Sequence, residues 1–479
     1  MKIAISRKNL WEALHPALRH AAGTMLGVIP QKYFLGGEFR RQHAFVEAAQ
    51  WWSPDVTRAY QLSELKRILT HAFNKSPYYR REFSRSGFNP QDIRSPDDIR
   101  ALPTINRDTI NEHLDEMCTL APRSANVDYI TTGGTSGSPL RFYIGSSRSA
   151  IEYAYLVAGW QRAGYRLGTP LAVLRGRIVK PSKRGYRYEH DPLFHNHYFS
   201  NFHMNEGNMA RYIEHIRDLG PCFLHVYPSS VATLARFLSS HDVKPPQNVL
   251  GILAESENVY PDQRRQVETV FSRRYFSGYG HTEKLVAAVE CEETENYHVW
   301  PTYGYFELLD MNDNPVTTPG QRGEIVGTGF INTVVPFVRY RTGDYATYLG
   351  SRCEQCGREH TIISDIRGHR TQEYLVGKDG TQISWTALNV HDDTFDNVLQ
   401  FQFCQEVPGS AVLKVVPGKK FGEVDRDRII EKLTRKLDNQ IAIRVERIEA
   451  LQLSSRGKMI YVDQRIPEHK RHPSEVEST

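Results

Sequence analysis

The chain has 479 residues, too many for one ordinary hydrophobic core, so we expect two or more domains. Its 40% hydrophobic and 24% charged residues are typical of a globular protein in solution, and its small net charge of +5 permits acidic small-molecule substrates. No block of Lys and Arg marks a nucleic-acid partner, and no apolar run of about 18 residues or more predicts a transmembrane segment.

The sequence favours the cytoplasm as the compartment. The N-terminal stretch MKIAISRKNLWEALHPALRHAAG is interrupted by charges and histidines where a signal peptide has an apolar core. Six cysteines in a chain of this length do not make a secreted disulfide framework. The oligomeric state stays open, with a dimer as one alternative.

The first part of the chain predicts helices followed by an alternating α/β domain. Residues 1–60 form a predicted N-terminal helical extension, and LSELKRILTHAFNKSPYYRREF (62–83) predicts a helix that is broken before Pro77. Helix-like segments then alternate with apolar runs typical of buried strands. These runs are LAVLRG (171–176), CFLHVYP (222–228), NVLGILAES (248–256) and RYFSGYG (274–280). The alternation predicts a largely parallel sheet.

The pattern changes twice further along the chain. Residues 299–348 switch to short strands and turns, which predicts a β-rich subdomain within a large domain of residues 61–366. After residue 367, VLQFQFCQE and GSAVLKVVPG predict paired strands, and RDRIIEKLTRKL predicts a helix with one apolar face. We therefore expect a small α+β domain over residues 367–466, followed by a disordered tail over 467–479.

The stretch Tyr129–Pro139, YITTGGTSGSP, carries the first chemical motif. Three glycines and five hydroxyl side chains follow an apolar strand end, and such a set of donors suits a phosphate chain. Ser138 stands where a Walker A loop has lysine, and the GxGxxG spacing of a dinucleotide site is absent. Taken alone, the stretch fits a polar surface turn equally well.

Two motifs downstream suit a nucleotide. SGYGHTE (277–283) follows a predicted strand, where Tyr279 offers a flat face to a base and Glu283 offers an oxygen ligand to Mg²⁺. RYRTGD (339–344) presents Asp344 after a glycine turn, where its carboxylate can accept hydrogen bonds from a ribose diol. The alternative for each is an ordinary loop residue, an Asx-turn in the case of Asp344.

Two further motifs suit a hinge and a mobile lysine. IRGHRTQEYL (366–375) places a glycine between arginines at the change of composition, as a hinge would require. SSRGKMIY (454–461) places Lys458 after a glycine, where a point-like ammonium can neutralise charge between a carboxylate and a phosphate. A plain basic linker and a surface lysine are the alternatives.

In this order, the motifs resemble the adenylate-forming enzymes, specifically the phenylacetate–CoA ligase-like group and its CapK-type branch found with capsular polysaccharide genes. The resemblance covers residues 62–466. It implies the acyl-adenylate-forming fold, with a large N-terminal α/β domain that includes a β-rich subdomain, and a small mobile C-terminal α+β domain. It also implies ATP and Mg²⁺ as cofactors.

The resemblance assigns roles to matching positions. Lys458 would be the catalytic lysine and Glu283 the Mg²⁺ ligand, while Arg370 would be the arginine of the hinge motif. That motif reads GHRTQE here, which leaves the choice between Arg367 and Arg370 open. The positions implied to contact the nucleotide or border the acyl pocket are Thr132, Gly133, Gly134, Thr135, Ser136, Gly137, Ala254, Glu255, Tyr279, Gly280, Thr282 and Asp344.

The cysteines predict a separate metal site. Cys353 and Cys356 have the spacing of a metal knuckle, CEQC, but one pair does not complete the four ligands of tetrahedral zinc. Cys291 and His298 supply a second pair, with His360 as an alternative to His298. We interpret the set as a structural Zn²⁺ site, and free buried thiols are the alternative reading.

The implied reaction is activation of a carboxylic acid by ATP, with release of pyrophosphate and formation of an acyl-adenylate. The acyl group then passes to a thiol, such as CoA, or to an amine, and we expect this chemistry in cell-surface polysaccharide biosynthesis. An aryl–CoA ligase of aromatic catabolism and a non-catalytic nucleotide-binding module on the same fold remain as alternatives. The sequence does not indicate which acid is activated.

Overall fold

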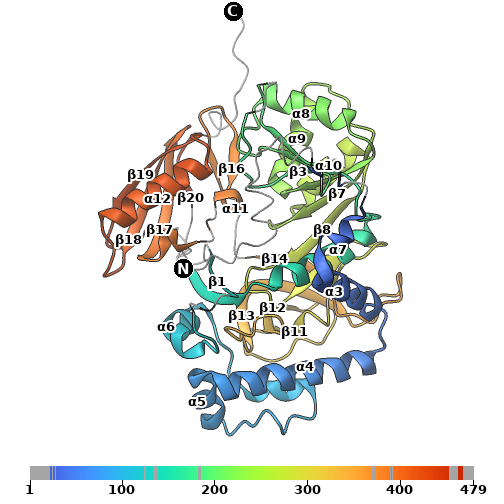
Figure 1. Ribbon diagram of the computed structural model, residues 1–479, viewed down its shortest axis with the longest axis vertical. Coiled ribbons are helices and arrows are strands. Elements are labelled where there is room, and N and C mark those ends of the chain that lie inside the picture. The colour runs from blue at the N-terminus through green and yellow to red at the C-terminus, as the bar shows by residue number, and fades with distance from the viewer. Residues whose placement is uncertain are drawn as a thin grey trace, which may run out of the picture.

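We describe the protein from a computed structural model, shown in Figure 1. The described residues are 22–23, 25–26, 29–122, 124, 126–132, 139–181, 185–368, 373–388, 390, 392–451 and 462–467. The first 21 residues of the predicted N-terminal extension and almost all of the predicted C-terminal tail lie outside them. Within the described residues, no helix is both long enough and apolar enough to cross a membrane.

A single 12-stranded sheet organises the large domain, in the order β11-β12-β13-β14-β10-β9-β8-β7-β6-β3-β5-β4. Its first group of strands is β3 (Leu171–Leu174), β4 (Tyr188–Asp191), β5 (Asn196–Phe199), β6 (Cys222–Val226), β7 (Val249–Glu255) and β8 (Tyr275–Gly280). Strands β5, β3, β6, β7 and β8 run parallel to their neighbours in this order, and β4 adds an antiparallel edge. The predicted parallel sheet is confirmed.

The predicted β-rich subdomain continues the same sheet. Its strands are β9 (Ala287–Glu290), β10 (Tyr297–Val299), β11 (Gly304–Leu309), β12 (Arg322–Gly329), β13 (Tyr340–Gly350) and β14 (Ile362–Arg367). The change of direction occurs between β8 and β9, which pair antiparallel through Tyr279 and Ala288. The two halves therefore share one hydrogen-bonded surface, and residues at the end of β8 lie beside the antiparallel half.

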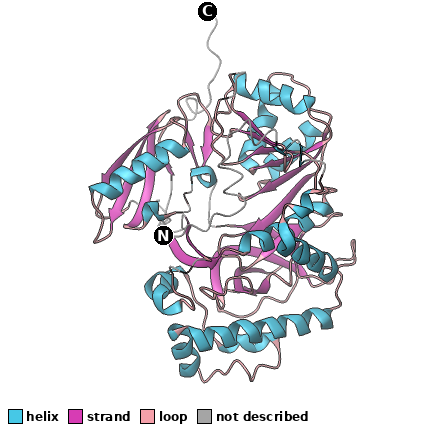
Figure 2. Ribbon diagram, in the orientation of Figure 1, coloured by secondary structure: helices cyan, strands magenta, loops and turns pink. Residues whose placement is uncertain are grey.

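Helices cover both faces of the parallel half, as a sheet with two apolar faces requires. Leu171 and Val173 pack with α3 (Gly36–Ala49) and α7 (Arg148–Arg162), whereas Ala172 and Leu174 pack on the opposite face. That second face is covered by α8 (Glu206–Asp218), α9 (Pro228–Ser240) and α10 (Pro261–Phe271). Figure 2 shows these layers.

The antiparallel half packs on helices from the N-terminal part of the chain. They are α4 (Pro54–Lys75), α5 (Pro77–Arg85) and α6 (Arg107–Met117). The predicted break before Pro77 is confirmed, because Ser76 ends α4 and its hydroxyl caps α5 by accepting a hydrogen bond from the Tyr79 N–H. Helix α4 runs through residue 60, so the described part of the predicted extension is continuous with this layer.

A separate module follows the large sheet and is coloured orange to red in Figure 1. It contains the sheet β19-β18-β17-β20 and the hairpin β15-β16. Its elements are β15 (Tyr374–Val376), β16 (Gln382–Ser384), α11 (Trp385–Leu388), β17 (Val398–Val407), β18 (Ser410–Pro417), α12 (Glu423–Lys436), β19 (Ala442–Arg447) and β20 (Val462–Gln464). Ile429 and Leu433 of α12 pack on the sheet, as the apolar face predicts. We call this part the C-terminal module.

Two further strands form a hairpin between the large domain and the C-terminal module. They are β1 (Val127–Thr132) and β2 (Leu140–Gly145), which pair antiparallel with Thr132 opposite Leu140. The glycine-rich stretch therefore joins the two ends of a hairpin, and its stem is fixed on both sides.

Candidate functional site

A cavity of about 860 Å³ lies at the carboxyl ends of the parallel strands, the usual place for a ligand in an α/β sheet. Arg175, Tyr227, Glu255 and Gly280 line it, each at or just after the end of its strand. The C-terminal module contributes Trp385 to the same lining. The residues of the predicted set that line the cavity are Thr132, Glu255, Tyr279, Gly280, Thr282, Glu283 and Asp344.

Tyr279 and Asp344 meet although 65 residues separate them. The Tyr279 hydroxyl donates to Asp344 Oδ2 at 2.9 Å. Burial and the Asp344 carboxylate raise the pKa of Tyr279 well above its ordinary value, so the hydroxyl keeps its proton and remains a donor. Gly343, at φ 75°, makes the turn before Asp344, and its N–H donates to Glu324 at 3.1 Å. The carboxylate is therefore held at the cavity wall by its neighbours.

Glu283 is a buried carboxylate that accepts hydrogen bonds from His281 and from its own backbone N–H. Its Oε2 accepts a hydrogen bond from His281 Nδ1 at 3.1 Å, and its residue is 8% exposed. The Val286 N–H donates to His281 Nε2 at 3.2 Å, which fixes the tautomer with the proton on Nδ1. Burial opposes ionisation, but the His281 hydrogen bond and the positive charge of Arg107 outweigh it and lower the Glu283 pKa to about 2. Glu283 is thus an ionised oxygen donor at neutral pH.

Glu255 lies where the cavity extends toward α7. Its Oε1 accepts from Trp160 Nε1 at 2.9 Å, and its Oε2 accepts from Arg175 at 2.9 Å and lies 3.4 Å from His225 Nε2. Burial raises the cost of ionising this carboxyl, but the contacts from His225, Arg175 and Trp160 lower its pKa to about 2. Ala254, by contrast, is fully buried in the core against the α8–α10 layer and does not line the cavity.

The stem of the glycine-rich stretch contacts the C-terminal module. Thr131 Oγ1 donates to the Asp392 carbonyl at 2.7 Å, and the Tyr129 hydroxyl donates to Asp396 Oδ1 at 2.6 Å. Arg141, in the return strand, donates to two module carbonyls, the nearer at 2.9 Å. Both strands that flank the glycine-rich stretch therefore contact the C-terminal module.

Several predicted site residues lie outside the described residues. They are Gly133, Gly134, Thr135, Ser136, Gly137, Arg370 and Lys458. Arg367 is described and lies at the end of β14, where its Nε donates to Asp365 at 2.8 Å and its side chain is 64% exposed. The choice between Arg367 and Arg370 at the hinge stays open.

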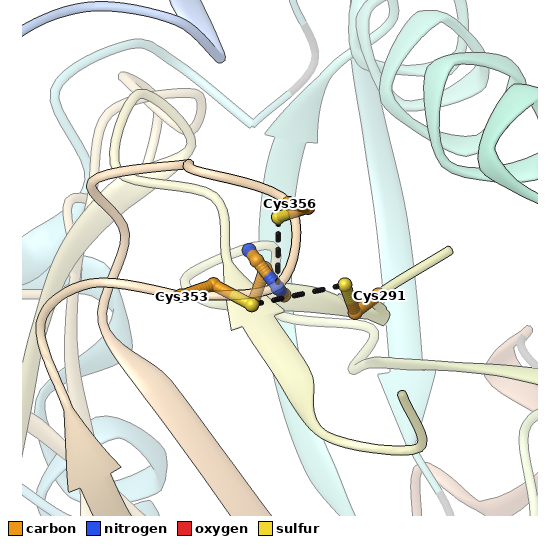
Figure 3. A group of neighbouring side chains, drawn as sticks. Cys291, Cys353 and Cys356 are labelled. Carbon is orange, nitrogen blue, oxygen red and sulfur yellow. Dashed lines mark hydrogen bonds between the residues drawn. The ribbon is translucent and has the colours of Figure 1, made fainter. Parts of the chain in front are cut away.

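The predicted cysteine–histidine set comes together in the antiparallel half of the sheet, and Figure 3 shows its three cysteines. Ligand atoms of Cys291, His298, Cys353 and Cys356 all lie within 4.8 Å of one another. The Cys291 and Cys353 sulfurs are 3.9 Å apart, and Cys356 Sγ is 3.8 Å from His298 Nε2. Sulfurs bound to tetrahedral zinc at about 2.3 Å are separated by about 3.8 Å, so the spacing fits that metal.

His298, rather than His360, is the nitrogen ligand that this geometry offers. The His360 ring centroid lies 5.6 Å from that of His298, and His360 is not part of the group. Burial and the nearby arginines lower the pKa of His298 to about 3, which leaves its imidazole neutral and able to coordinate. We call Cys291, His298, Cys353 and Cys356 the Cys₃His cluster.

Sequence reasoning missed four residues of the site. Trp160, Arg175, His225 and His281 hold the two carboxylates of the cavity, yet none belongs to a recognisable motif apart from His281, which lies inside YGHTE. Arg175, His225 and His281 lie at or near strand ends, which supplies a signal because parallel strands place such residues at one edge, whereas Trp160 lies within α7 and carries no such signal.

Comparisons with known proteins relate both parts of the chain to others. A family model described as the CapK C-terminal domain matches residues 375–465. The phenylacetate-coenzyme A ligase of Pseudomonas putida is 27% identical over 316 residues, 64% of this chain and 70% of that protein. Protein CapK of Staphylococcus aureus is 22% identical over 342 residues, 71% of this chain and 73% of that protein.

A solved structure shares the overall fold. It is a 2-hydroxyisobutyryl-CoA ligase in complex with 2-HIB-AMP and CoA, with a TM-score of 0.54 and 16% sequence identity. The match covers 87% of this chain and 91% of that chain. At this identity the likeness concerns the fold, and it includes both the large domain and the C-terminal module.

Proposed function

We propose that this chain, a phenylacetate–CoA ligase-like, CapK-type adenylate-forming enzyme, activates a carboxylic acid as an acyl-adenylate. The acyl group then passes to a thiol or an amine. The observation that carries the proposal is the common cavity of Thr132, Tyr279, Glu283 and Asp344. A base platform, a metal-ligand carboxylate and a ribose acceptor are what ATP needs there.

The nucleotide end of the cavity would bind ATP through three contacts. The Tyr279 ring would stack on adenine, and Asp344 would accept hydrogen bonds from the ribose hydroxyls. Glu283 fits Mg²⁺ because it is ionised and its Oε1 accepts no hydrogen bond from another residue in the described part of the chain. Bound Mg²⁺ would neutralise charge on the phosphates.

The reaction would proceed by attack of the carboxylate oxygen on the α-phosphorus, with pyrophosphate as the leaving group. Both reactants are anions, so charge repulsion and alignment dominate the barrier. Donors of the stretch 132–139 would hold the departing pyrophosphate. Lys458 would bridge the acid and the α-phosphate, and Arg370 would act at the hinge that brings the C-terminal module into place.

Glu255 would separate the nucleotide from the acid. Its oxygens are already bound by Trp160 and Arg175, so the carboxylate has little capacity left for a ligand. We assign it the task of fixing this wall of the cavity, with Tyr153, Trp160 and Tyr198 lining the acid end. An ionised carboxylate facing an ionised substrate is tolerated because Arg175 neutralises it.

Two settings for the reaction remain distinct candidates. The match of the CapK C-terminal domain and the CapK relative favour cell-surface polysaccharide biosynthesis in the cytoplasm. The phenylacetate-coenzyme A ligases among the relatives favour an aryl–CoA ligase of aromatic catabolism, with CoA as the acceptor. A screen of carboxylic acids by pyrophosphate release, run with CoA and then with amines, separates the two.

The mechanism itself is tested at Lys458. The variant Lys458→Ala should lose acid-dependent ATP–pyrophosphate exchange while it still binds ATP. Lys420→Ala is the matched control, because Lys420 is an exposed lysine of the same module. Exchange that survives in Lys458→Ala would reject the proposed mechanism, whereas a parent protein that binds ATP but supports no exchange with any acid would favour a non-catalytic nucleotide-binding module.

We further propose that the Cys₃His cluster binds a structural Zn²⁺. All four ligand atoms are within reach of one ion, and three thiolates with one imidazole leave no coordination position for a substrate. Metal analysis of the purified protein should find one zinc per chain. Absence of zinc, together with rapid alkylation of Cys291, Cys353 and Cys356 in the native protein, would reject the site.

A further inference from the structure

We infer that two arginines beside the Cys₃His cluster, the half-buried Arg162 and the buried Arg358, neutralise an anionic metal–thiolate centre. Through them, metal binding would hold helix α3 and one wall of the cavity in place. The inference rests on the proposed zinc site and goes beyond it, because it assigns a function to groups that do not touch the metal ion.

The charges around the cluster are unbalanced without a metal. Arg358 is 4% exposed, and its Nη1 donates to both oxygens of Glu292 at 2.6 Å. Arg162 Nε and Nη1 are shielded from solvent and have no hydrogen-bond partner among the described residues. Its Nη2 contacts only the neutral Gln50 amide, at 3.4 Å. One carboxylate therefore faces two guanidinium groups.

Metal binding would remove this imbalance. Three thiolates and one divalent cation carry a net charge of −1, which together with Glu292 offsets the two positive charges of Arg162 and Arg358. The centre would thus supply the negative charge that Glu292 alone does not, and an uncompensated positive charge is costly in a protein interior. The pair of arginines is thus suited to an anionic centre and poorly suited to free thiols.

The first arginine connects the cluster to helix α3. Arg358 Nε donates to Gln50 Oε1 at 3.0 Å, and its guanidinium lies 4.2 Å from the ring of Trp51. Gln50 is the residue that ends α3. Arg358 therefore holds Trp51 and the last turn of α3 in place. The proposed metal centre would balance the charge of this arginine.

The second arginine connects the cluster to the cavity. The Arg162 guanidinium lies 4.4 Å from the ring of Trp300, which lines the cavity and follows His298 by two residues. Arg162 also lies two residues after Trp160, the indole that donates to Glu255. The acid end of the cavity is thus attached to the cluster through Arg162 and its neighbours on α7.

Metal affinity tests the electrostatic part of the inference. Zinc is removed by a competing chelator and its affinity compared across variants. Arg162→Met and Arg358→Met should weaken binding by about 10- to 100-fold, the usual effect of losing an outer-shell partner. Arg162→Lys should restore most of the loss, and Arg166→Met, an exposed arginine in the turn after α7, should bind like the parent protein.

Glu292→Gln tests the direction in which a nearby negative charge changes the zinc affinity. Removal of this negative charge should leave zinc affinity unchanged or higher, because the two arginines then no longer share their positive charge with Glu292. A purely packing role predicts weaker binding for Glu292→Gln as well, and such a result would overturn charge neutralisation.

Hydrogen–deuterium exchange tests the connection to α3 and the cavity. Chelation of zinc from the full-length protein should raise exchange in residues 46–52 and 298–303, with β17 as the internal control. Unchanged exchange in both segments would overturn the connection. Failure of the protein to bind Zn²⁺ or Co²⁺ at all would reject the zinc site itself, whereas zinc bound equally by Arg162→Met, Arg358→Met and Arg166→Met would reject only the arginine inference.

Discussion

Replacement of Asp344 by alanine should weaken ATP binding through the ribose alone. Asp344 accepts a hydrogen bond from the Tyr279 hydroxyl at 2.9 Å, and an ionised carboxylate has capacity for further donors. In the proposed complex those donors are the two ribose hydroxyls. Asp344→Ala removes the acceptor but leaves Glu283 and the acid end of the cavity in place.

The size of the effect follows from the charge on the acceptor. A hydrogen bond to an ionised group contributes about 1.5 to 3 kcal/mol, and each 1.4 kcal/mol corresponds to about a tenfold change in affinity. Loss of one ribose bond corresponds to a rise of about 10- to 100-fold in the KM for ATP, so loss of both should raise it by at least that much. The KM for the acid should change little, because in the proposed complex Asp344 does not contact the acid.

The assay compares ATP with 2′-deoxy-ATP and 3′-deoxy-ATP in acid-dependent pyrophosphate exchange. The parent protein should favour ATP over each analogue, and Asp344→Ala should bind all three alike. Tyr279→Phe is the matched control, because it removes the hydroxyl that holds Asp344 but keeps the ring and the carboxylate. Equal discrimination against the deoxy analogues in the parent protein and in Asp344→Ala would refute the assignment of Asp344 to the ribose.

Three other predictions concern the metal, the core and pH. Glu283→Gln keeps the shape of the side chain but loses its charge, so the Mg²⁺ concentration for half-maximal exchange should rise at least about tenfold; an unchanged Mg²⁺ titration would contradict the metal role. Arg339→Met removes the bidentate partner of the buried Glu307, at 3.0 and 3.1 Å, and should lower the free energy of unfolding in urea by about 3 to 5 kcal/mol. The double variant with Glu307→Leu should recover much of that loss, and no recovery would argue against a pairing effect. Burial is the main cause, and the neighbouring histidine rings the second, that lower the pKa of His197 to about 3. The stability that the neutral His197 side chain contributes is therefore fully present above pH 6.5 and is lost as the pH falls toward 3. His197→Gln should reduce the loss of stability between pH 7 and pH 5 by on the order of 1 kcal/mol in urea titrations, and an unchanged loss would assign acid sensitivity to other groups.

The sequence was informative wherever a feature depended on residues close in the chain. Apolar runs such as 222–228 and 248–256 predict buried strands because a parallel sheet covered on both faces needs apolar side chains in both directions. The break before Pro77 follows from its missing N–H and from the serine that precedes it. The spacing of Cys353 and Cys356 likewise reports a local turn.

Features that depend on pairing between distant strands were not predictable. The β-rich stretch joins the same sheet as the parallel strands, because β8 pairs with β9, and no local pattern reveals such a partner. Strands β10 and β14 pair antiparallel, with His298 opposite Ile362, and this register brings His298 toward the CEQC turn. Arg175 and His225 reach Glu255 from separate strands, so only the assembled sheet identifies them as a group.

The C-terminal module is joined to the large domain by both apolar and polar contacts. The hydrophobic core that contains Leu413 and Leu433 also includes Phe202 and Tyr227 of the large domain. The polar contacts include the Tyr129 hydroxyl to Asp396 and the ion pair between Arg187 and Asp438. A hydrogen bond to a charged group contributes about 1.5 to 3 kcal/mol net.

The polar contacts join the module to two separate parts of the large domain. Tyr129 and Thr131 belong to the stem of the stretch 132–139, whereas Arg187 precedes β4 and Asn205 caps α8, where Asn205 donates to Asp379 at 3.0 Å. The segment with Lys458 begins and ends within the module, between β19 and β20. In the proposed mechanism, Lys458 would reach the phosphates only when the module is docked, and the hydrogen bonds to the stem would align the module with the stretch proposed to hold the leaving pyrophosphate. Docking and phosphate alignment would then be one event, which limits adenylation to the state in which the acid, the nucleotide and the lysine are all in place.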